Sequence, residues 1–342
     1  MTELIFTVGR ASGADLEKHV QTGATMARLT FSYGTNETQL RRALELRRLA
    51  EKNAKKLEIC GELEGQRLRI GKISKDGIED DILVEKGRKY LFLDVNAVDK
   101  RRTTDCIPIP SLLAQGLKEN DRIVYGDTGS EFEVTCISDD GIAAIALNSD
   151  VIVGTRSVLI ADRPLPAFRF DEKSKSQAEY ILASEPFDFL VVPSVLDHEI
   201  LLEAREMIKA SGRKVGLISK LGFPIKLSNL SRICDISEFV ILDRADCALA
   251  HGEVSMPGVV EGIISSFPHV ASKLIISSQI ASSMGRSDSR KLAYPEISDI
   301  WNFVDLGIAG FMLAEETAVD TNGVQALVQV STLISTYSNT AS

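Results

Sequence analysis

The residues best suited to chemistry in this sequence are basic and hydroxyl-bearing side chains near the ends of apolar segments. Arg28 and Ser32 belong to the segment Gly23–Thr35, and Lys220 follows the apolar run Val215–Ile218. A charged side chain within an apolar strand is costly to bury unless a partner or a ligand compensates it. These basic groups are therefore candidates for binding an anionic substrate, and the alternative for each is a buried ion pair.

The elements that must position these side chains are eight short apolar runs separated by helical patterns. The runs are continuous rather than alternating, as in strands that are covered on both faces. They are Leu4–Val8, Met26–Phe31, Leu57–Cys60, Phe189–Val192, Val215–Ile218, Phe239–Leu242, Leu274–Ile276 and Phe311–Leu313. This order predicts an α/β fold, a (β/α)8 TIM barrel, in which catalytic groups stand at the carboxyl ends of the strands.

Helical segments occupy the spaces between the runs. An apolar stripe predicts a helix over Thr38–Asn53. Asp197 can cap a helix over Glu199–Ala210, and Pro295 opens a helix that continues through Val304. Each helix can return the chain to the start of the next parallel strand.

The pattern changes between Lys72 and about Arg156, where short β-branched runs are separated by turn residues. This stretch predicts a small all-β barrel domain inserted after the third strand, over the carboxyl end of the larger barrel. We place the barrel domain at residues 1–71 and 159–342, and the inserted cap at residues 72–158. A cap in that position can close over a site and exclude water.

Composition and charge exclude several classes of protein. The chain has 342 residues and a formal net charge of −9, which argues against nonspecific binding of nucleic acid. No apolar run approaches the roughly 20 residues that span a bilayer, and the N-terminus lacks the pattern of a secretory signal. The five cysteines are scattered without metal-binding spacing, as suits a reducing compartment. We therefore expect a cytoplasmic protein without a nucleic-acid or membrane partner.

Several segments, in the same order along the chain, resemble signature segments of the pyruvate kinase family. Thr7-Val-Gly9 is similar to Thr-Ile-Gly, and Ala27-Arg-Leu-Thr-Phe-Ser-Tyr-Gly34 to Ala-Arg-Leu-Asn-Phe-Ser-His-Gly. Leu217-Ile-Ser-Lys220 resembles Ile-Ile-Ser-Lys, and Asp243-Arg-Ala-Asp246 resembles Ala-Arg-Gly-Asp. Further similar segments are Asp121-Arg-Ile-Val124, Ser278-Gln279 with Met284, and Ala314-Glu-Glu-Thr-Ala318.

The resemblance implies a glycolytic phosphotransferase that acts on phosphoenolpyruvate and pyruvate, or on a related enol phosphate, with ADP or ATP. The family usually has a further C-terminal domain that carries allosteric sites and part of the tetramer interface. Because the sequence ends at Ser342, soon after the eighth unit, we expect no C-terminal allosteric domain. A homo-oligomer through the barrel is compatible with another family interface.

The resemblance also assigns roles to individual residues. Lys220 matches the lysine that stabilises the phosphoryl group in transit, and Arg28 matches the phosphate-binding arginine. Ser278 stands where the family has a threonine and can still relay a proton or hold a water near the enolate carbon. Arg244, Ala245 and Asp246 match the segment that seats the substrate carboxylate, with Ala245 in place of glycine.

Structural roles remain open as alternatives for the two basic residues. Lys220 can instead pair with Asp243 or Glu62, and Arg28 can pair with Glu62 or Glu64. In addition, the family's arginine just before the first strand would fall near Met1, so one charge that binds nucleotide or phosphate is missing.

The expected divalent-metal site is incomplete. Asp246 matches one of the family's two metal carboxylates, but the other falls at Gly222, which has no ligand. We expect Mg²⁺ or Mn²⁺ held by Asp246 and by oxygen atoms of the substrate, with Glu62, Glu64 or Glu315 as candidates to complete the site.

The monovalent-cation site departs further from the family. Its Asn, Ser, Asp and Thr positions are Thr30, Ser32, Glu62 and Leu63 here, and Leu63 has no side-chain ligand. Arg67 falls where potassium-independent members carry a basic residue, and its guanidinium can supply the missing positive charge. We therefore expect no K⁺ requirement; the alternative is that Arg67 is an ordinary surface arginine.

Three functions follow as hypotheses. The first is a pyruvate kinase-like phosphotransferase whose activity is altered. The second is a lyase or aldolase that acts on a 2-oxoacid in the same barrel, although such enzymes typically hold their metal with a Glu–Asp pair. The third is a non-catalytic relative that binds an anionic metabolite or a partner protein, as loss of the metal carboxylate would suggest.

Overall fold

A computed structural model describes most of the chain. The described residues are 2–9, 15–32, 34–65, 68, 74–75, 78–79, 82–94, 106–125, 130–152, 158–161, 167–266, 268–285, 290–318 and 322–340. They divide into two compact units, one made of residues 1–65 and 167–342 and the other of residues 66–166.

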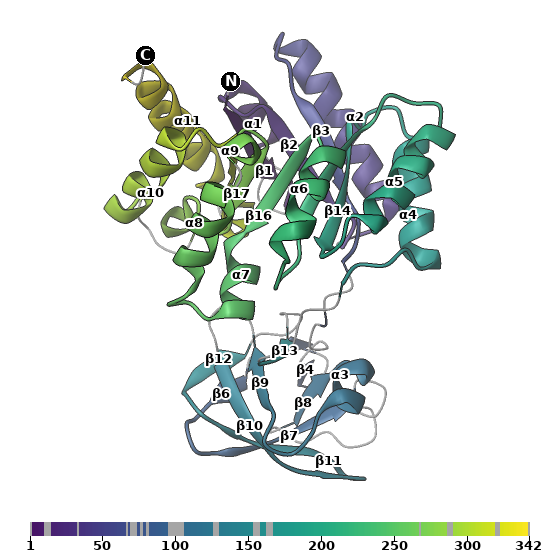
Figure 1. Ribbon diagram of the computed structural model, residues 1–342, viewed down its shortest axis with the longest axis vertical. Coiled ribbons are helices and arrows are strands. Elements are labelled where there is room, and N and C mark those ends of the chain that lie inside the picture. The colour runs from purple at the N-terminus through teal and green to yellow at the C-terminus, as the bar shows by residue number, and fades with distance from the viewer. Residues whose placement is uncertain are drawn as a thin grey trace. The chain divides into compact units, whose positions relative to one another are not determined.

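The first unit is built on a closed barrel of eight parallel strands, which confirms the predicted (β/α)8 architecture (Figure 1). The strands are β1 (Glu3–Thr7), β2 (Met26–Thr30), β3 (Glu58–Glu62), β14 (Phe189–Val195), β15 (Gly216–Leu221), β16 (Phe239–Asp243), β17 (Leu274–Ser277) and β18 (Gly310–Met312). Around the barrel they follow chain order, and β18 pairs with β1 to close the circle. Each of the eight predicted apolar runs lies on one of these strands, with ends shifted by a few residues.

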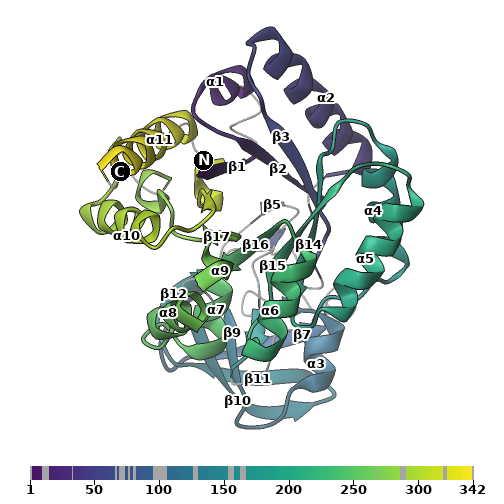
Figure 2. The same ribbon diagram turned by 45° about the horizontal axis from the view of Figure 1, so that its top comes forward.

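Helices surround the strands on the outside of the barrel (Figure 2). They are α1 (Leu16–Gln21), α2 (Asn36–Lys52), α4 (Glu172–Ala183), α5 (Glu199–Ala210), α6 (Leu227–Ile236), α7 (Arg244–His251), α8 (Met256–Ser266), α9 (Pro268–Ala271), α10 (Tyr294–Asp305) and α11 (Gly323–Thr340). Short 3₁₀ turns cover Ser282–Met284 and Glu315–Ala318. The predicted helix over Glu199–Ala210 has the bounds that the sequence indicated, although the capping residue is His198 rather than Asp197, whose carboxylate accepts the Glu199 amide at 3.3 Å.

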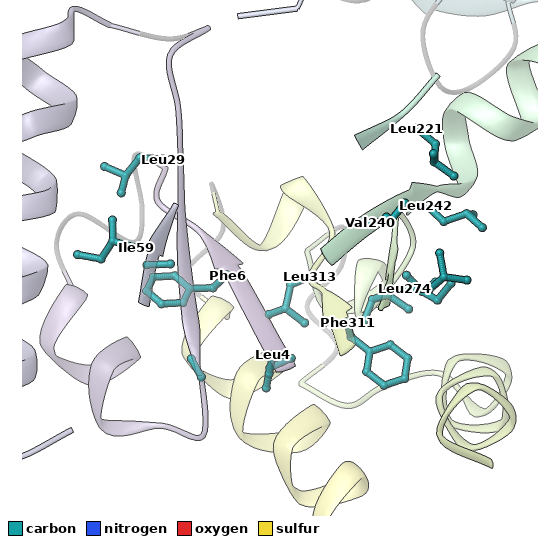
Figure 3. Packing of buried hydrophobic residues seen from close by; sticks show 14 of the residues in the cluster. Leu4, Phe6, Leu29, Ile59, Leu221, Val240, Leu242, Leu274, Phe311 and Leu313 are labelled. Atoms are coloured by element: carbon teal, nitrogen blue, oxygen red, sulfur yellow. The ribbon is translucent and has the colours of Figure 1, made fainter. Parts of the chain in front are cut away.

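The barrel has two separate apolar layers because neighbouring residues of a strand point to opposite faces. Figure 3 shows outward-facing residues such as Leu4, Phe6 and Phe311, which belong to the core between strands and helices. The interior is filled by one residue from each strand: Ile5, Met26, Cys60, Val191, Ile218, Ile241, Ile275 and Met312. The barrel is therefore a packed core rather than a pore.

The second unit is a β structure with its own core, as the sequence predicted. Its main sheet has six strands in the order β13-β9-β10-β11-β7-β8. The unit contains β4 (Ser74–Lys75), β5 (Ile78–Glu79), β6 (Ile82–Val84), β7 (Lys89–Asp94), β8 (Cys106–Ile109), α3 (Ser111–Gly116), β9 (Arg122–Tyr125), β10 (Ser130–Ser138), β11 (Gly141–Ala146), β12 (Asp150–Ile152) and β13 (Val158–Ile160). Phe132 packs edge-on against both Tyr90 and Phe92 at the centre of this core.

Within the part of the chain that the structure describes, no helix combines the length and apolar character that a membrane crossing needs.

Candidate active site

A layer of polar side chains lies directly beyond the apolar interior of the barrel, toward the carboxyl ends of its strands. Side chains alternate between the two faces of a strand, so the residue two positions after an interior apolar residue also points into the barrel. At that step six strands carry Thr7, Arg28, Glu62, Lys220, Asp243 and Ser277, and each of these residues is at most 8% exposed. The predicted basic residues Arg28 and Lys220 thus belong to the same buried layer, at the end of the barrel where catalytic groups are found in this fold.

Arg28 forms a two-pronged ion pair with Glu62 on the neighbouring strand. Its Nε bonds Oε2 of Glu62, its Nη2 lies 2.8 Å from Oε1, and its Nη1 donates to the Thr7 hydroxyl at 3.0 Å. Burial by itself would lower the pKa of Arg28, but the charge of Glu62 and, less strongly, that of Glu315 outweigh this effect and raise it. Arg28 is therefore a fixed cation, and of the two carboxylates proposed from sequence it is Glu62 that pairs with it.

Lys220 pairs with Asp243 at the ends of the adjacent strands β15 and β16. Lys220 Nζ lies 2.5 Å from Asp243 Oδ2, and both side chains are about nine-tenths buried. The other carboxylate oxygen, Oδ1, accepts a hydrogen bond from the Ser278 hydroxyl. The structure thus joins two predicted catalytic residues, Lys220 and Ser278, through one carboxylate.

Asp243 also caps α7, the helix that begins at the next residue. Its Oδ1 accepts the backbone N–H groups of Ala245 at 3.1 Å and of Asp246 at 3.3 Å. An aspartate at this position satisfies amides that the first turn of a helix leaves without partners. The predicted substrate-binding segment 244–246 is therefore held at its start by the same carboxylate that binds Lys220.

Arg244 faces the turn after β17. Its Nη2 donates to the Ser278 carbonyl at 2.7 Å, and its Nη1 lies 2.5 Å from Asp299 Oδ2 on α10. The guanidinium also stacks over the Phe303 ring, 5.5 Å from its centre. These contacts place Arg244 as a support for Ser278 in the structure, whereas its predicted contact with substrate stays a prediction.

The turn that carries Ser278 has an unusual backbone. Ser278, Gln279 and Ala281 have φ angles of 68°, 58° and 61°, in the left-handed region that residues other than glycine seldom adopt. Such conformations persist only where surrounding contacts hold them, and they cluster at functional sites. Here Arg244 holds the Ser278 carbonyl and Asp243 holds its hydroxyl, so the Ser278 side chain has a defined direction.

Gly222, where the family has a metal carboxylate, follows the end of β15 and lies against the neighbouring strand. A Cβ atom at this position would meet Leu196 Cδ2 and the backbone C and O atoms of Ser194, each at 3.0 Å. Strand β14 changes register beside it, between Val192 and Val195, and Ser194 has a φ of 50°. A side chain at position 222 would therefore require this irregular stretch of backbone to shift.

The described residues show no divalent-metal site made of several protein ligands. No group of three or more histidine, cysteine, aspartate or glutamate side chains among them is arranged to hold a metal ion. Of the carboxylates predicted to hold the metal, Asp246 is buried, with 2% of its surface exposed. Glu62 forms an ion pair with Arg28, and Glu64 lies 2.5 Å from Lys173, so both already have a basic partner.

The residues predicted for the monovalent-cation site are only partly described. The Thr30 hydroxyl lies 3.1 Å from the Ser32 hydroxyl, and Leu63 is fully buried. Glu62, the acidic member of the set, bonds Arg28. Arg67 lies outside the described residues, so its proposed replacement of potassium stays a prediction.

Sequence reasoning named Asp243 only as one of two partners that could neutralise Lys220. Its central position, between Lys220, Ser278 and the start of α7, was missed. A signal was present, since Asp243 is a carboxylate in the position where the family segment Ala-Arg-Gly-Asp has alanine.

Comparisons with known proteins agree with this architecture. The family model described as pyruvate kinase, barrel domain, matches residues 1–327. The pyruvate kinase of Thermococcus litoralis is 22% identical over 98% of this chain and 69% of its own length. That of Buchnera aphidicola is 26% identical over 93% of this chain and 66% of its own length.

A solved structure has the same fold. The crystal structure of pyruvate kinase from Pyrobaculum aerophilum superposes with a TM-score of 0.75 at 20% identity, covering 98% of this chain and 73% of that one. The chain spans about two thirds of the length of the two curated relatives. Because the family model covers nearly all of the sequence, the chain belongs to the pyruvate kinase family.

Proposed function

We propose that this protein is a pyruvate kinase-like phosphotransferase, which moves a phosphoryl group between an enol phosphate such as phosphoenolpyruvate and a nucleotide such as ADP. The observation that carries the proposal is the placement of Arg28 and Lys220 in one buried polar layer at the carboxyl end of the barrel. Phosphoryl transfer depends mainly on positioning and on fixed positive charge around the moving group, and this layer supplies such charge.

The residues predicted to act in catalysis and in substrate binding each have a role in this reaction. Lys220 stabilises the phosphoryl group as it leaves the enol oxygen, and Arg28 binds phosphate oxygens. An ammonium has three N–H donors and a guanidinium has five, so each can contact a ligand while it keeps its carboxylate partner. Ser278 holds the proton donor near the enolate carbon, and the segment 244–246 at the start of α7 seats the substrate carboxylate, as the resemblance to the family implies.

The divalent metal is the part of the family's chemistry that this chain is least equipped to hold. Members of the family generally use Mg²⁺, but Gly222 has no ligand and Glu62 is bound to Arg28. None of the roles proposed above passes through a metal. The expected dependence on Mg²⁺ or Mn²⁺ and independence of K⁺ remain proposals that the activity assay tests directly.

A phosphoryl-transfer assay with purified protein tests the proposal. ATP formation from ADP should be measured with phosphoenolpyruvate, in the presence of Mg²⁺ or Mn²⁺. Formation of ATP that requires phosphoenolpyruvate supports the proposed function, whereas its absence with both metals contradicts it. Light scattering during gel filtration would test the predicted homo-oligomer, and cell fractionation the predicted cytoplasmic location.

A binding role without catalysis is the second candidate, and one observation favours it. Position 222, where the family has a metal carboxylate, is a glycine here, and no group of three or more potential ligands among the described residues is arranged to hold a metal ion. Calorimetric titration with phosphoenolpyruvate would separate the two candidates, because binding without turnover would favour this second role. The lyase or aldolase hypothesis needs a Glu–Asp metal pair, and the glycine at position 222 weakens it too.

A further inference from the structure

Asp243 contacts three parts of the predicted site at once: the ammonium of Lys220, the hydroxyl of Ser278 and the start of α7. Its Oδ2 lies 2.5 Å from Lys220 Nζ, while its Oδ1 accepts the Ser278 hydroxyl and the amides of Ala245 and Asp246. Its side chain is 8% exposed. A carboxylate with this set of contacts fixes an ammonium, a hydroxyl and a helix start relative to one another.

Two departures from the family segments involve carboxylates and lie on adjacent strands. The acidic residue two positions after the lysine is absent here, since Gly222 occupies that position, whereas Asp243 stands in place of the alanine of Ala-Arg-Gly-Asp. Strands β15 and β16 pair directly, with Lys220 opposite Ile241. One carboxylate is thus missing just after β15, and another is present at the end of β16.

The structure gives a physical reason why position 222 does not carry the carboxylate. A Cβ atom there would lie 3.0 Å from the backbone of Ser194, in the stretch where β14 changes register. That distance is shorter than an ordinary van der Waals contact, and a glutamate would add further atoms. At position 243 the carboxylate is instead held by amides of α7, which stabilise negative charge at a helix start.

We propose that Asp243 is a positioning residue of the active site, a carboxylate at the end of β16 in a chain that lacks one at Gly222. It orients the ammonium of Lys220 toward the phosphoryl group and the hydroxyl of Ser278 toward the enolate carbon. It contacts neither reacting group itself. This inference rests on the proposed phosphotransferase function. It adds to that function a residue, Asp243, that stands where the family segment has alanine.

The role predicts an effect on turnover rather than on substrate binding. Lys220 and Ser278 act mainly on groups whose charge changes during the reaction, so their exact placement matters most in the transition state. A buried ammonium that loses its carboxylate is no longer held in place, and the nearly isosteric Asp243→Asn change removes the charge and replaces one of the two acceptor oxygens by an NH2 group. An asparagine can still accept hydrogen bonds from Ser278 and from the start of α7.

The test compares Asp243→Asn with Asp243→Glu, using kcat, KM and the melting temperature of the full chain. Glu238→Gln is the matched control, because Glu238 also pairs with a basic side chain, that of Arg205, just before β16. We expect Asp243→Asn to lower kcat by about tenfold or more while KM for phosphoenolpyruvate changes by less than about threefold. Asp243→Glu, which keeps the charge but alters the shape, should retain more kcat than Asp243→Asn.

A double variant completes the test. If Asp243 acts through Lys220, Lys220→Met with Asp243→Asn should be no slower than Lys220→Met alone, because the effects of interacting residues are not additive. An Asp243→Asn enzyme with a kcat within about twofold of wild type would overturn the inference. So would a lower kcat in Asp243→Glu than in Asp243→Asn. A wild type without turnover would instead discard the proposed function, and the catalytic role of Asp243 with it.

Discussion

Lys220 pairs with a carboxylate two residues beyond its direct neighbour on the adjacent strand, and Arg28 does the same. Lys220 stands opposite Ile241 and bonds Asp243, while Arg28 stands opposite Cys60 and bonds Glu62. Strands of a barrel are tilted and staggered, which brings such diagonal side chains together in one layer. The two ion pairs are thus equivalent parts of a single polar layer.

Removal of the lysine alone should destabilise the fold. Lys220→Met leaves Asp243 buried without its cationic partner, and breaking a buried pair in this way costs about 3–5 kcal/mol. Urea denaturation of Lys220→Met and of Lys220→Met with Asp243→Leu would measure this. The double variant should recover part of the loss, and a single variant as stable as wild type would contradict the buried pair.

The Arg28–Glu62 pair should show strong coupling. Its two parallel contacts need a guanidinium, so Arg28→Lys keeps the charge but loses the two-pronged geometry. We expect Arg28→Met to cost about 3–5 kcal/mol and Arg28→Lys less. A double-mutant cycle with Glu62→Gln should give a coupling free energy of about 1–3 kcal/mol, and a value near zero would exclude the pair.

Substitution of Gly222 tests the close approach of β14. Because a Cβ atom would lie 3.0 Å from the Ser194 backbone, Gly222→Ala should lower the free energy of unfolding by about 1–3 kcal/mol. Gly258→Ala in α8 is the control, since a Cβ atom there would meet nothing within 4 Å. Alanine favours helix over glycine, so the control should be neutral or stabilising. Equal effects at both positions would contradict the crowding at Gly222.

The pH dependence of stability should include a contribution from His19. Burial lowers the pKa of His19 below its ordinary value of 6.5, an effect that outweighs the hydrogen bond to the Asp15 carbonyl and the nearby charge of Asp15, while Lys18 lowers it further. Below pH 6.5 the unfolded chain therefore binds more protons at this histidine than the folded chain does. Stability is fully present above that pH and is lost as the pH falls toward the lowered value.

Denaturation at a series of pH values checks the contribution of His19. His19→Asn should weaken the dependence of stability on pH just below pH 6.5. An unchanged profile in His19→Asn would show that this imidazole does not resist protonation in the folded protein.

The fold was predictable because its strands are continuous apolar runs, such as Phe239–Leu242. Finding these runs in the sequence was enough, and it was not necessary to work out which strand pairs with which. The partners of Lys220 and Arg28 were less accessible to sequence reasoning. Both Glu62 and Asp243 were candidates for Lys220, and only the register of β15 and β16 selects Asp243.

The crowding around Gly222 could not be predicted from the sequence. Gly222 was recognised as a position without a metal ligand, but the lack of space for a side chain there depends on a register change in β14 and on the left-handed backbone of Ser194. No local pattern in the sequence indicates either feature, because both arise when separate strands pack together.

The most direct measurement is phosphoenolpyruvate-dependent formation of ATP from ADP, with Mg²⁺ or Mn²⁺, with and without K⁺. Wild type should be compared with Lys220→Ala and with the control Glu238→Gln, which changes a carboxylate away from the polar layer. The account predicts activity that does not require K⁺ and that falls by about a hundredfold or more in Lys220→Ala but not in the control. No activity in the wild type with either metal, or equal activity in Lys220→Ala, would contradict it.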